Sequence, residues 1–333
     1  MAVTISDVAK RAGVSTATVS RVINGANNVD EQMRQTVLRT MKEMGYIPNS
    51  IAQSLRQNRS KTIGITTSDL SIAFFPNVLK AVESAFLPLD YATLSSSTYD
   101  DPKNERKILQ HMLARRVDAL VVNSTGQNEE LLEETAQAGI PVILYDRRSR
   151  ERHFPTVYVN KQRSMSLALD HLLGLGHRRV MLATGPKMLA TNYDRFMGMQ
   201  KYAFDHDFDP ALFTARFGDF SIAFGQDVMA DIVRMPQPPT AVVTGSVAIT
   251  AGIMMYCRKH GIKIPSDMAI VSSGTFNYAS IVEPRLTYLD DCAEKIAEGL
   301  TALLGRALKG ESLSEAGTIE IDPILHVGTS SVQ

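Results

Sequence analysis

Residues 4–25 read TISDVAKRAGVSTATVSRVING, which is the pattern of two short helices joined by a tight turn. Thr4 and Asp7 have the spacing of a capping box at a helix start, and Gly13 is a typical residue at a helix end. Apolar residues of the first helix recur at intervals of three and four, at Ile5, Val8, Ala9 and Ala12. Ser15 is a good N-cap, so the stretch predicts a second helix that begins immediately after the turn.

The second predicted helix has a surface of small hydroxyl side chains around one arginine. Ser15, Thr18 and Ser20 can donate hydrogen bonds to DNA phosphates, and they are short enough to let the backbone approach DNA. Arg21 can make the bidentate contact to guanine, the commonest specific base contact. The apolar side chains are expected to face the first helix: Val19, Val22 and Ile23. This pattern is typical of a helix-turn-helix, whose second helix enters the major groove.

A third helix is predicted from Asp30, a good N-cap, to Gly45, which ends it. Its apolar residues are expected to form one stripe, at Met33, Val37, Leu38, Met41 and Met44. Three amphipathic helices of this size can enclose a small shared core. We therefore expect residues 1–47 to fold as an all-α headpiece.

The chain of 333 residues carries no net formal charge, but its charges are unevenly distributed. Residues 1–61 hold nine Lys or Arg against four Asp or Glu, a net charge of +5, so the remaining residues carry −5. A basic module on a mildly acidic body predicts a polyanionic partner for the module alone. Together with the helix pattern, this charge predicts that the partner is double-stranded DNA.

Residues 46–61, YIPNSIAQSLRQNRSK, differ from the segments on either side. Pro48 disfavours a helical conformation at Ile47. The apolar side chains between Ser50 and Arg56 are few: Ile51, Ala52 and Leu55. Because a helix this short is marginal in water, we expect residues 48–60 to be a linker that is helical only when a partner holds it.

From Lys61 onward, strand-like and helix-like segments alternate, which predicts an α/β fold with parallel sheets flanked by helices. The length of this alternation fits two doubly wound lobes better than one. Ligands of such folds bind at the carboxyl ends of the strands. The expected first lobe comprises about residues 61–160 and 291–317, and the expected second lobe about 161–290 and 318–333.

The composition disfavours several classes of protein. No run of about 18 apolar residues exists, and the charged start MAVTISDVAKRAG lacks the apolar segment of a signal peptide, so we expect a cytoplasmic protein. Cys257 and Cys292 form neither a disulfide framework nor a metal-binding spacing. The sequence has no phosphate-cradling loop, no nucleophile elbow and no His/Cys cluster. We therefore expect no cofactor, no metal and no enzymatic activity.

The sequence resembles the LacI/GalR family of bacterial transcription regulators over residues 4–310. The resemblance rests on the opening stretch and then, in the family's order, on GYIPNSIAQSLR, RVDALVV, GIPVILYDR, HLLGLGHRRV, HGIKIPSDMAIV and EPRLTYL. It implies a helix-turn-helix headpiece, a hinge helix in the linker and a two-lobed effector domain like the periplasmic sugar-binding proteins. It also implies a homodimeric repressor that binds a pseudo-palindromic operator and responds to a small polar effector.

The resemblance also implies which residues contact DNA. Thr16, Ala17 and Arg21 fall where the family contacts bases, and Ala17 can meet a thymine methyl group. Leu55 falls on the hinge leucine that family members insert into the minor groove, and Ala52 is small enough to allow that approach. The full expected set is Ser15, Thr16, Ala17, Thr18, Ser20, Arg21, Asn24, Asn49, Ala52 and Leu55.

The effector site implied by the resemblance lies between the lobes. Arg195 matches the family's ligand-binding arginine, whose guanidinium can donate to hydroxyl, carboxylate or phosphate groups. Phe74 or Phe75 falls where the family often stacks a ring on the ligand, although the same rings would suit a core equally well. Asp146, at the end of PVILYD, matches an acidic ligand position. The other expected effector-binding residues are Ser246, Thr275 and Asp291.

Two acidic features of the family are missing here. Gly245 and Ser246 stand where the family usually has Asn-Asp, and SSGTFNY at 272–278 lacks the acid that usually follows that strand. Without these acids a neutral hexose is the weaker expectation, and a sugar acid or sugar phosphate becomes plausible. Asp290 or Asp291 could restore an acid, so the sequence leaves the effector class open.

Two other classes of protein fit the sequence less well than a regulator does. A secreted or membrane-tethered binding protein of the same two-lobed fold is disfavoured by the headpiece, and DNA binding by the whole chain would distinguish it. A nucleotide-dependent enzyme is disfavoured because the one Gly-x-Gly, in GLGH at 174–177, precedes a strand instead of following one. Assembly is expected to stop at the dimer, because IDPILHVGTSSVQ has no leucine heptad.

Overall fold

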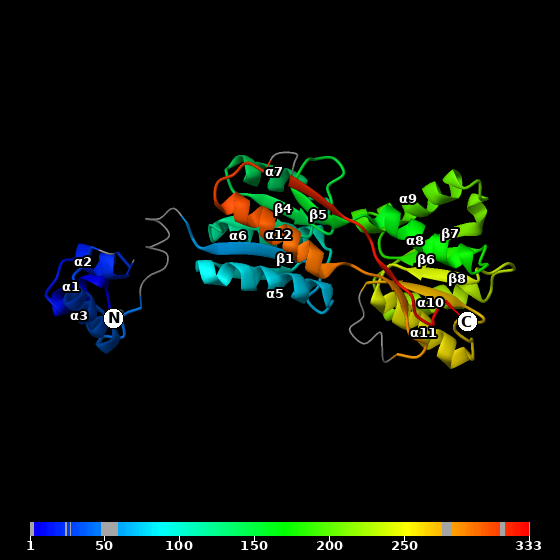
Figure 1. Cartoon of the computed structure of the whole chain (residues 1–333), viewed down its shortest axis with the longest axis horizontal. Coiled ribbons are helices and arrows are strands. Elements are labelled where there is room, and N and C mark those ends of the chain that lie inside the picture. The colour runs from blue at the N-terminus through cyan, green and yellow to red at the C-terminus, as the bar shows by residue number, and fades with distance from the viewer. Residues whose placement is uncertain are drawn as a thin grey trace. The chain divides into compact units, whose positions relative to one another are not determined.

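The computed structural model describes residues 3–23, 25–26, 28–47, 59–274, 282–313 and 317–332. The chain divides into two compact units, residues 1–60 and 61–333. We call the first the headpiece and the second the two-lobed unit (Figure 1).

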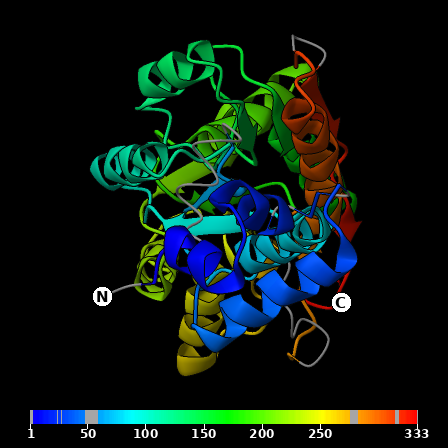
Figure 2. The same cartoon turned by 90° about the vertical axis from the view of Figure 1, so that its left-hand side faces the viewer.

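The headpiece contains the helices α1 (Ile5–Ala12), α2 (Thr16–Ile23) and α3 (Glu31–Glu43), drawn in blue in Figure 2. Thr4 and Asp7 form the predicted capping box. The backbone N–H of Asp7 donates to Thr4 Oγ1 at 3.3 Å, and the backbone N–H of Thr4 donates to Asp7 Oδ2 at 2.9 Å. Gly13 ends α1 with φ of 69°, a left-handed conformation that glycine adopts without steric cost. These contacts confirm the predicted pair of helices and the turn between them.

A small apolar core joins the three helices of the headpiece. Its buried members are Val8, Ala9, Val19, Val22 and Val37. The predicted stripe on α3 is only partly right, because Met33 and Leu38 are 41% and 44% exposed. Leu38 lies about 100° around the helix from Val37 and so leaves the buried face, whereas Thr40 shares that face and is buried.

The first lobe is built on a six-stranded parallel sheet in the order β11-β5-β4-β3-β1-β2. Helices cover both of its faces: the core on one face comes from α5 and α12, and the core on the other from α6 and α7. The strands are β1 (Thr62–Thr67), β2 (Ala92–Ser97), β3 (Ala119–Val122), β4 (Val142–Tyr145), β5 (Thr156–Val159) and β11 (Thr318–Ile321). The helices are α5 (Phe74–Phe86), the 3-10 turn η1 (Leu87–Leu89), α6 (Pro102–Ala114), α7 (Glu129–Gln137) and α12 (Ala293–Leu308).

The second lobe repeats this plan on a sheet in the order β12-β10-β9-β8-β6-β7, parallel except for the short β12. Helices α8 and α9 cover one face, and α10 and α11 the other. The strands are β6 (Val180–Thr184), β7 (Phe213–Phe217), β8 (Ala241–Thr244), β9 (Ala269–Ser273), β10 (Thr287–Leu289) and β12 (Leu325–His326). The helices are α8 (Lys161–Gly174), α9 (Ala190–Asp205), the 3-10 turn η2 (Pro210–Leu212), α10 (Ile222–Ile232) and α11 (Val247–His260). The predicted doubly wound α/β fold is confirmed.

One predicted lobe assignment is wrong. Residues 318–333 were expected in the second lobe, but residues 318–321 form β11, which pairs with β5 of the first lobe. The chain then returns to the second lobe, where residues 325–326 form β12 against β10. The periodicity of so short a strand does not show which sheet edge it completes.

Two glycines set how closely α10 packs on α11. A Cβ built on Gly252 would lie 2.1 Å from the carbonyl oxygen of Ile222, and one built on Gly225 would lie 2.3 Å from that of Ile249. Because the obstacle in each case is backbone, no side-chain rotation relieves it. The two helices can approach this closely only because both positions lack a side chain.

We therefore expect Gly252→Ala to lower the free energy of unfolding by about 1–3 kcal/mol, the usual cost of overpacking a core. Gly305→Ala in α12 is the matched control, because a Cβ there meets nothing within 4 Å. It should be neutral or slightly stabilising, since alanine has the higher helix propensity. Urea unfolding followed by circular dichroism measures both, and equal effects of the two variants would contradict the close-packing argument.

Candidate functional site

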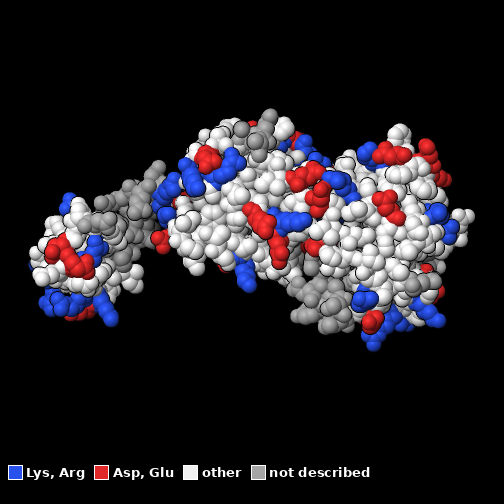
Figure 3. Space-filling model, in the orientation of Figure 1, with Lys and Arg blue, Asp and Glu red and all other residues white. Residues whose placement is uncertain are grey.

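The predicted DNA-contacting surface of α2 is exposed in the headpiece. Ser15, Thr16, Ala17 and Arg21 are all exposed, and Thr18 is half-buried. Ser15 Oγ accepts a hydrogen bond from the backbone N–H of Thr18 at 3.1 Å, which confirms its role as the cap of α2. Figure 3 shows Lys and Arg side chains on the surface of this unit. A flat, hydroxyl-rich surface with one long cationic side chain is suited to approach a groove of DNA.

Ser20 does not lie on that surface. It is 7% exposed, so little of the residue is accessible in the headpiece. The predicted contact of Ser20 with a DNA phosphate stays a prediction, and this burial does not favour it. Four other predicted DNA contacts lie outside the described residues, as does most of the predicted linker: Asn24, Asn49, Ala52 and Leu55.

In the two-lobed unit, charged side chains gather where the strands of the first lobe end. Asp146 directly follows β4 and has φ of 59°. Its Oδ1 lies 3.2 Å from Nζ of Lys161, the first residue of α8, and both side chains are largely buried. Burial alone would raise the pKa of Asp146, but that pKa is lowered because the charges of Lys161, Arg147 and Arg195 outweigh burial. Asp146 is therefore an anion in this crevice.

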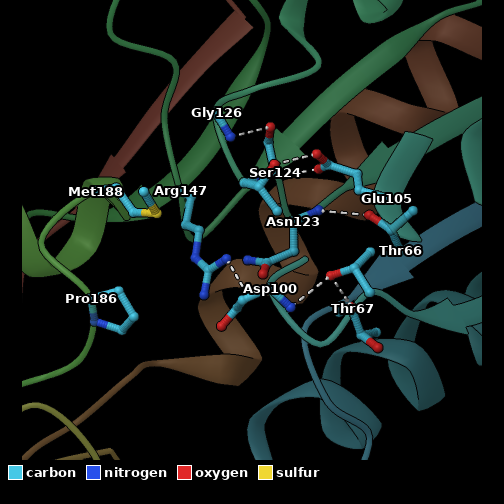
Figure 4. A network of polar contacts seen from close by, with 12 residues as sticks. Thr66, Thr67, Asp100, Glu105, Asn123, Ser124, Gly126, Arg147, Pro186 and Met188 are labelled. Carbon is cyan, nitrogen blue, oxygen red and sulfur yellow. Dashed lines mark hydrogen bonds and ion pairs between the residues drawn. The ribbon is translucent and has the colours of Figure 1, made fainter. Parts of the chain in front are cut away.

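A second ion pair joins Arg147 to Asp100, which lies in the loop after β2. The Arg147 side chain in this pair is buried. Nη1 of Arg147 donates to Oδ1 of Asp100 at 2.6 Å (Figure 4). Burial opposes the charge on Arg147, yet Asp100 holds the pKa of that guanidinium above its ordinary value. Nε of Arg147 and Oδ1 of the neighbouring Asn123 are buried without a hydrogen-bond partner among the described residues. Figure 4 shows Pro186 and Met188 of the second lobe across from Arg147, so a ligand between the lobes could use these free polar atoms.

A buried carboxylate fixes the loop after β3, which borders the same crevice. Glu105 on α6 is fully buried and accepts hydrogen bonds from the backbone N–H of Thr125 at 2.9 Å and from Nδ2 of Asn128 at 2.7 Å. The Thr125 hydroxyl also donates to it. These bonds hold residues 123–128 in place beside Arg147 (Figure 4).

The second lobe contributes Arg195, which is on α9 and 8% exposed. Its Nη1 donates to Oδ1 of Asn192 at 3.2 Å, and the same oxygen accepts a hydrogen bond from the Thr184 hydroxyl at 2.7 Å. The pKa of Arg195 is lowered, because burial outweighs the opposing charges of Asp146 and Asp291. The structure thus brings together three predicted effector-site residues, Asp146, Arg195 and Asp291.

Other predicted effector residues are occupied by packing or capping. Phe74 and Phe75 are buried in the core of the first lobe, and their ring centroids lie 6.3 and 6.2 Å from that of Tyr145. Of the two roles considered for these rings, this packing favours the core. The Ser246 hydroxyl accepts from the backbone N–H of Ile249 and caps α11. Thr275 lies outside the described residues.

Several crevice residues were missed by the sequence reasoning. These are Asp100, Asn123, Arg147, Lys161, Thr184 and Asn192. For some of them a signal was available, because Asn123 and Lys161 directly follow, or nearly follow, strands whose carboxyl ends face the crevice. For Asn192 the only signal is its position three residues before Arg195, on the same face of a helix.

Contacts beside the crevice also link the two lobes. Nε and Nη2 of Arg148 donate to the two carboxylate oxygens of Asp194 at 3.2 and 3.3 Å. The guanidinium of Arg150 lies 4.1 Å from the ring centroid of Tyr193. These two arginines, with loop residues of both lobes such as Ser124 and Met188, line a hollow of about 140 Å³. The crevice is therefore bridged on this side in the conformation described.

Among the described residues, no helix is both long and apolar enough to cross a membrane, and no group of three His, Cys, Asp or Glu side chains is placed to hold a metal. Cys257 and Cys292 are unpaired and buried, and burial raises the pKa of the Cys257 thiol to about 11. Neither thiol has the environment of a reactive cysteine.

A helix-turn-helix headpiece joined to a two-lobed domain with a charged crevice defines a ligand-responsive transcription regulator as the class of this protein. Residues 4–49 match the bacterial regulatory proteins of the lacI family, and residues 60–314 match the periplasmic binding proteins and sugar binding domain of the LacI family. The chain belongs to the LacI family. It is a DNA-binding regulator and not an enzyme.

Individual relatives span nearly the whole chain. The HTH-type transcriptional repressor PurR of Edwardsiella ictaluri (strain 93-146) is 30% identical over 97% of this chain and 95% of that protein. Catabolite control protein A of Priestia megaterium is 27% identical over 86% of this chain and 87% of that protein. Among solved structures, the Lac repressor dimer bound to operator and the anti-inducer ONPF has a TM-score of 0.86 at 25% identity and covers 100% of both chains. The likeness therefore includes the headpiece as well as both lobes.

Proposed function

We propose that this protein is a cytoplasmic repressor that binds a pseudo-palindromic DNA operator as a homodimer. A small polar effector, namely a sugar, a sugar acid or a sugar phosphate, binds between the two lobes and changes operator affinity. The observation that carries the proposal is the exposed surface of α2. Ser15, Thr16 and Ala17 are exposed where the helix begins, and Arg21 is exposed about one turn further along it.

Physical reasons support α2 as the recognition helix. Its first turn carries side chains no larger than threonine, so the backbone can lie close to the base edges. Arg21 is the exposed residue of α2 with a long side chain, and its guanidinium can donate two hydrogen bonds to O6 and N7 of guanine. The net charge of +5 over residues 1–61 supplies a sequence-independent attraction to phosphates.

The effector part of the proposal is supported by the crevice chemistry. Asp146, Arg147, Lys161 and Arg195 place charged groups of both signs at the facing edges of the two lobes, largely shielded from water. Polar ligands gain most from such groups, because charge-assisted hydrogen bonds are stronger than neutral ones. A homodimer is supported by the likeness to the Lac repressor dimer.

The test is a selection of binding sites from random double-stranded DNA with the full chain. We expect the enriched sites to be inverted repeats, because a two-fold symmetric dimer reads two half-sites. Sedimentation of the complex should give two chains per site. Enrichment of sites without an inverted repeat, or sedimentation of the free chain as a tetramer at micromolar concentration, would contradict the proposal.

A further inference from the structure

Helix α6 carries a stripe of exposed cations on the outside of the first lobe. Its inner side is formed by the buried Glu105, Leu109 and Met112. Residues 102–116 hold five Lys or Arg and one carboxylate, although residues 62–333 as a whole carry a net charge of −5. All five cations are exposed, and we call them the α6 stripe: Lys103, Arg106, Lys107, Arg115 and Arg116.

The α6 stripe forms no ion pair with any described residue, since the ion pairs found there involve other cations. The carboxylates of α6 and its ends bind other groups. Asp101 caps the helix by accepting from the backbone N–H of Lys103 at 2.7 Å, and the buried Glu105 holds the loop after β3. Asp118 accepts from the backbone N–H of Lys61 at 3.0 Å. The positive charge of the stripe is therefore presented to solvent.

Most of this charge does not help the helix to fold. Lys103 and Lys107 are four residues apart and lie side by side, and like charges at that spacing destabilise a helix. Lys103 is also in the first turn, where the helix dipole disfavours a cation. The dipole favours only Arg115 and Arg116, at the carboxyl end. Binding of a polyanion explains the stripe where helix stability does not.

The carboxyl end of α6 lies where the linker from the headpiece enters the first lobe. Lys61 precedes β1, and its backbone N–H donates to Asp118, two residues after Arg116. The backbone N–H of Asp118 donates in turn to the carbonyl oxygen of Thr62 at 2.8 Å. The linker, residues 48–60, can span at most about 45 Å even when extended. DNA bound by the headpiece therefore continues within reach of this lobe.

Double-stranded DNA fits the stripe better than an acidic protein does. The 13 residues of α6 extend over about 20 Å, and B-DNA presents one phosphate charge for about every 1.7 Å of its axis. Protein interfaces instead concentrate their binding energy in buried apolar or aromatic anchors. Besides its cations, the exposed positions of α6 hold Gln110, His111 and Ala114, which provide no such anchor.

We propose that the α6 stripe binds the phosphate backbone of the DNA that flanks the operator. The two-lobed unit would then add a sequence-independent contact to the base contacts of the headpiece, because cations that neutralise phosphates release counterions. A homodimer carries the stripe twice, once for each flank. This inference goes beyond the proposed function, which assigns operator recognition to α2, and it rests on that function for the operator itself.

The test uses the full chain and two DNA fragments. One fragment is the selected operator trimmed to its two half-sites, and the other extends it by about 15 base pairs, or about 50 Å, at each end. The triple variant Arg106→Gln/Lys107→Gln/Arg116→Gln should bind the long fragment on the order of 10-fold more weakly at about 0.1 M salt. It should bind the trimmed fragment as the wild type does. Fluorescence anisotropy titrations measure both affinities.

The salt dependence provides a second readout. Each phosphate contact contributes about 0.9 to the slope of log K against log salt, so the triple variant should lower that slope by up to about 3 on the long fragment. Arg234→Gln/Lys259→Gln/Lys263→Gln is the matched control, because it removes the same charge from exposed side chains of the second lobe. The control should keep wild-type affinity and slope on both fragments.

Three results would overturn the inference: equal affinity of the wild type for both fragments, equal losses of the α6 variant on both, or equal losses by the α6 variant and the control. Poly-L-glutamate tests the other kind of partner. If it binds the wild type but not the α6 variant, while both bind the long fragment equally, the stripe binds an acidic protein and the DNA inference is wrong. Failure of the proposed function is distinguishable, because the wild type would then not bind the trimmed inverted repeat.

Discussion

Replacing Arg147 by methionine should lower the free energy of unfolding by about 3 kcal/mol. Removing one partner of a buried ion pair typically costs about 3–5 kcal/mol, because the other charge is left without compensation. Here the stranded group is Asp100, whose side chain is 19% exposed and can recover some hydration, so we expect the lower end of that range. Methionine preserves most of the volume of the arginine stem, which limits any cavity. Urea unfolding measures the loss.

Two comparisons test this explanation. Adding Asp100→Asn to Arg147→Met removes the stranded charge and should recover much of the stability, because a pair of neutral groups carries no unpaired charge. Arg152→Met is the matched control, since Arg152 pairs with Glu133 on the surface and exposed pairs contribute about 0–1 kcal/mol. If Arg147→Met and Arg152→Met were equally destabilising, the buried pair would contribute no more than an exposed one.

Replacing Arg21 by alanine should weaken operator binding by about 1–3 kcal/mol, or roughly 5- to 150-fold, and should flatten the base preference at one position of each half-site. The reason is that Arg21 is the long exposed donor on α2, among side chains too short to reach far into the groove. Titration of the selected operator and of its single-base variants measures both effects. Unchanged affinity and unchanged preference would remove Arg21 from the interface.

Arg11→Ala is the matched control for Arg21. Arg11 is exposed on α1 and carries the same charge, but α1 of a helix-turn-helix crosses the DNA backbone instead of entering the groove. Its loss should weaken binding to all sequences alike and reduce the dependence on salt by about one ionic contact. If Arg11→Ala and Arg21→Ala change the base preference in the same way, the assignment of α2 as the recognition helix is wrong.

The sequence by itself determined the headpiece almost completely. The capping box at Thr4, the left-handed Gly13 and the caps at Ser15 and Asp30 were all predicted and are all present. Such features involve residues within about one helical turn of one another, so the local sequence specifies them. Leu38 was misplaced because the edge of a buried face depends on how the helices cross, and spacing alone does not show this.

The sequence also determined the alternation of strands and helices and the position of two charged groups. TIGITT became β1 with the same bounds, and Asp146 and Arg195 were correctly expected near one another between the lobes. The roles of Phe74 and Phe75 stayed undecided because an aromatic ring beside a strand end suits a ligand and a core equally well. The structure packs both against Tyr145.

The tertiary structure alone decided which distant residues meet. It pairs β11 with β5, places Arg147 against Asp100, and lets Gly245 make room for the Thr184 hydroxyl that supports Asn192 and Arg195. Each of these contacts joins segments brought together by sheet order or by helix packing. The spacing of residues along one segment encodes neither the sheet order nor the helix packing. The free energy that selects both comes from burying all the elements at once.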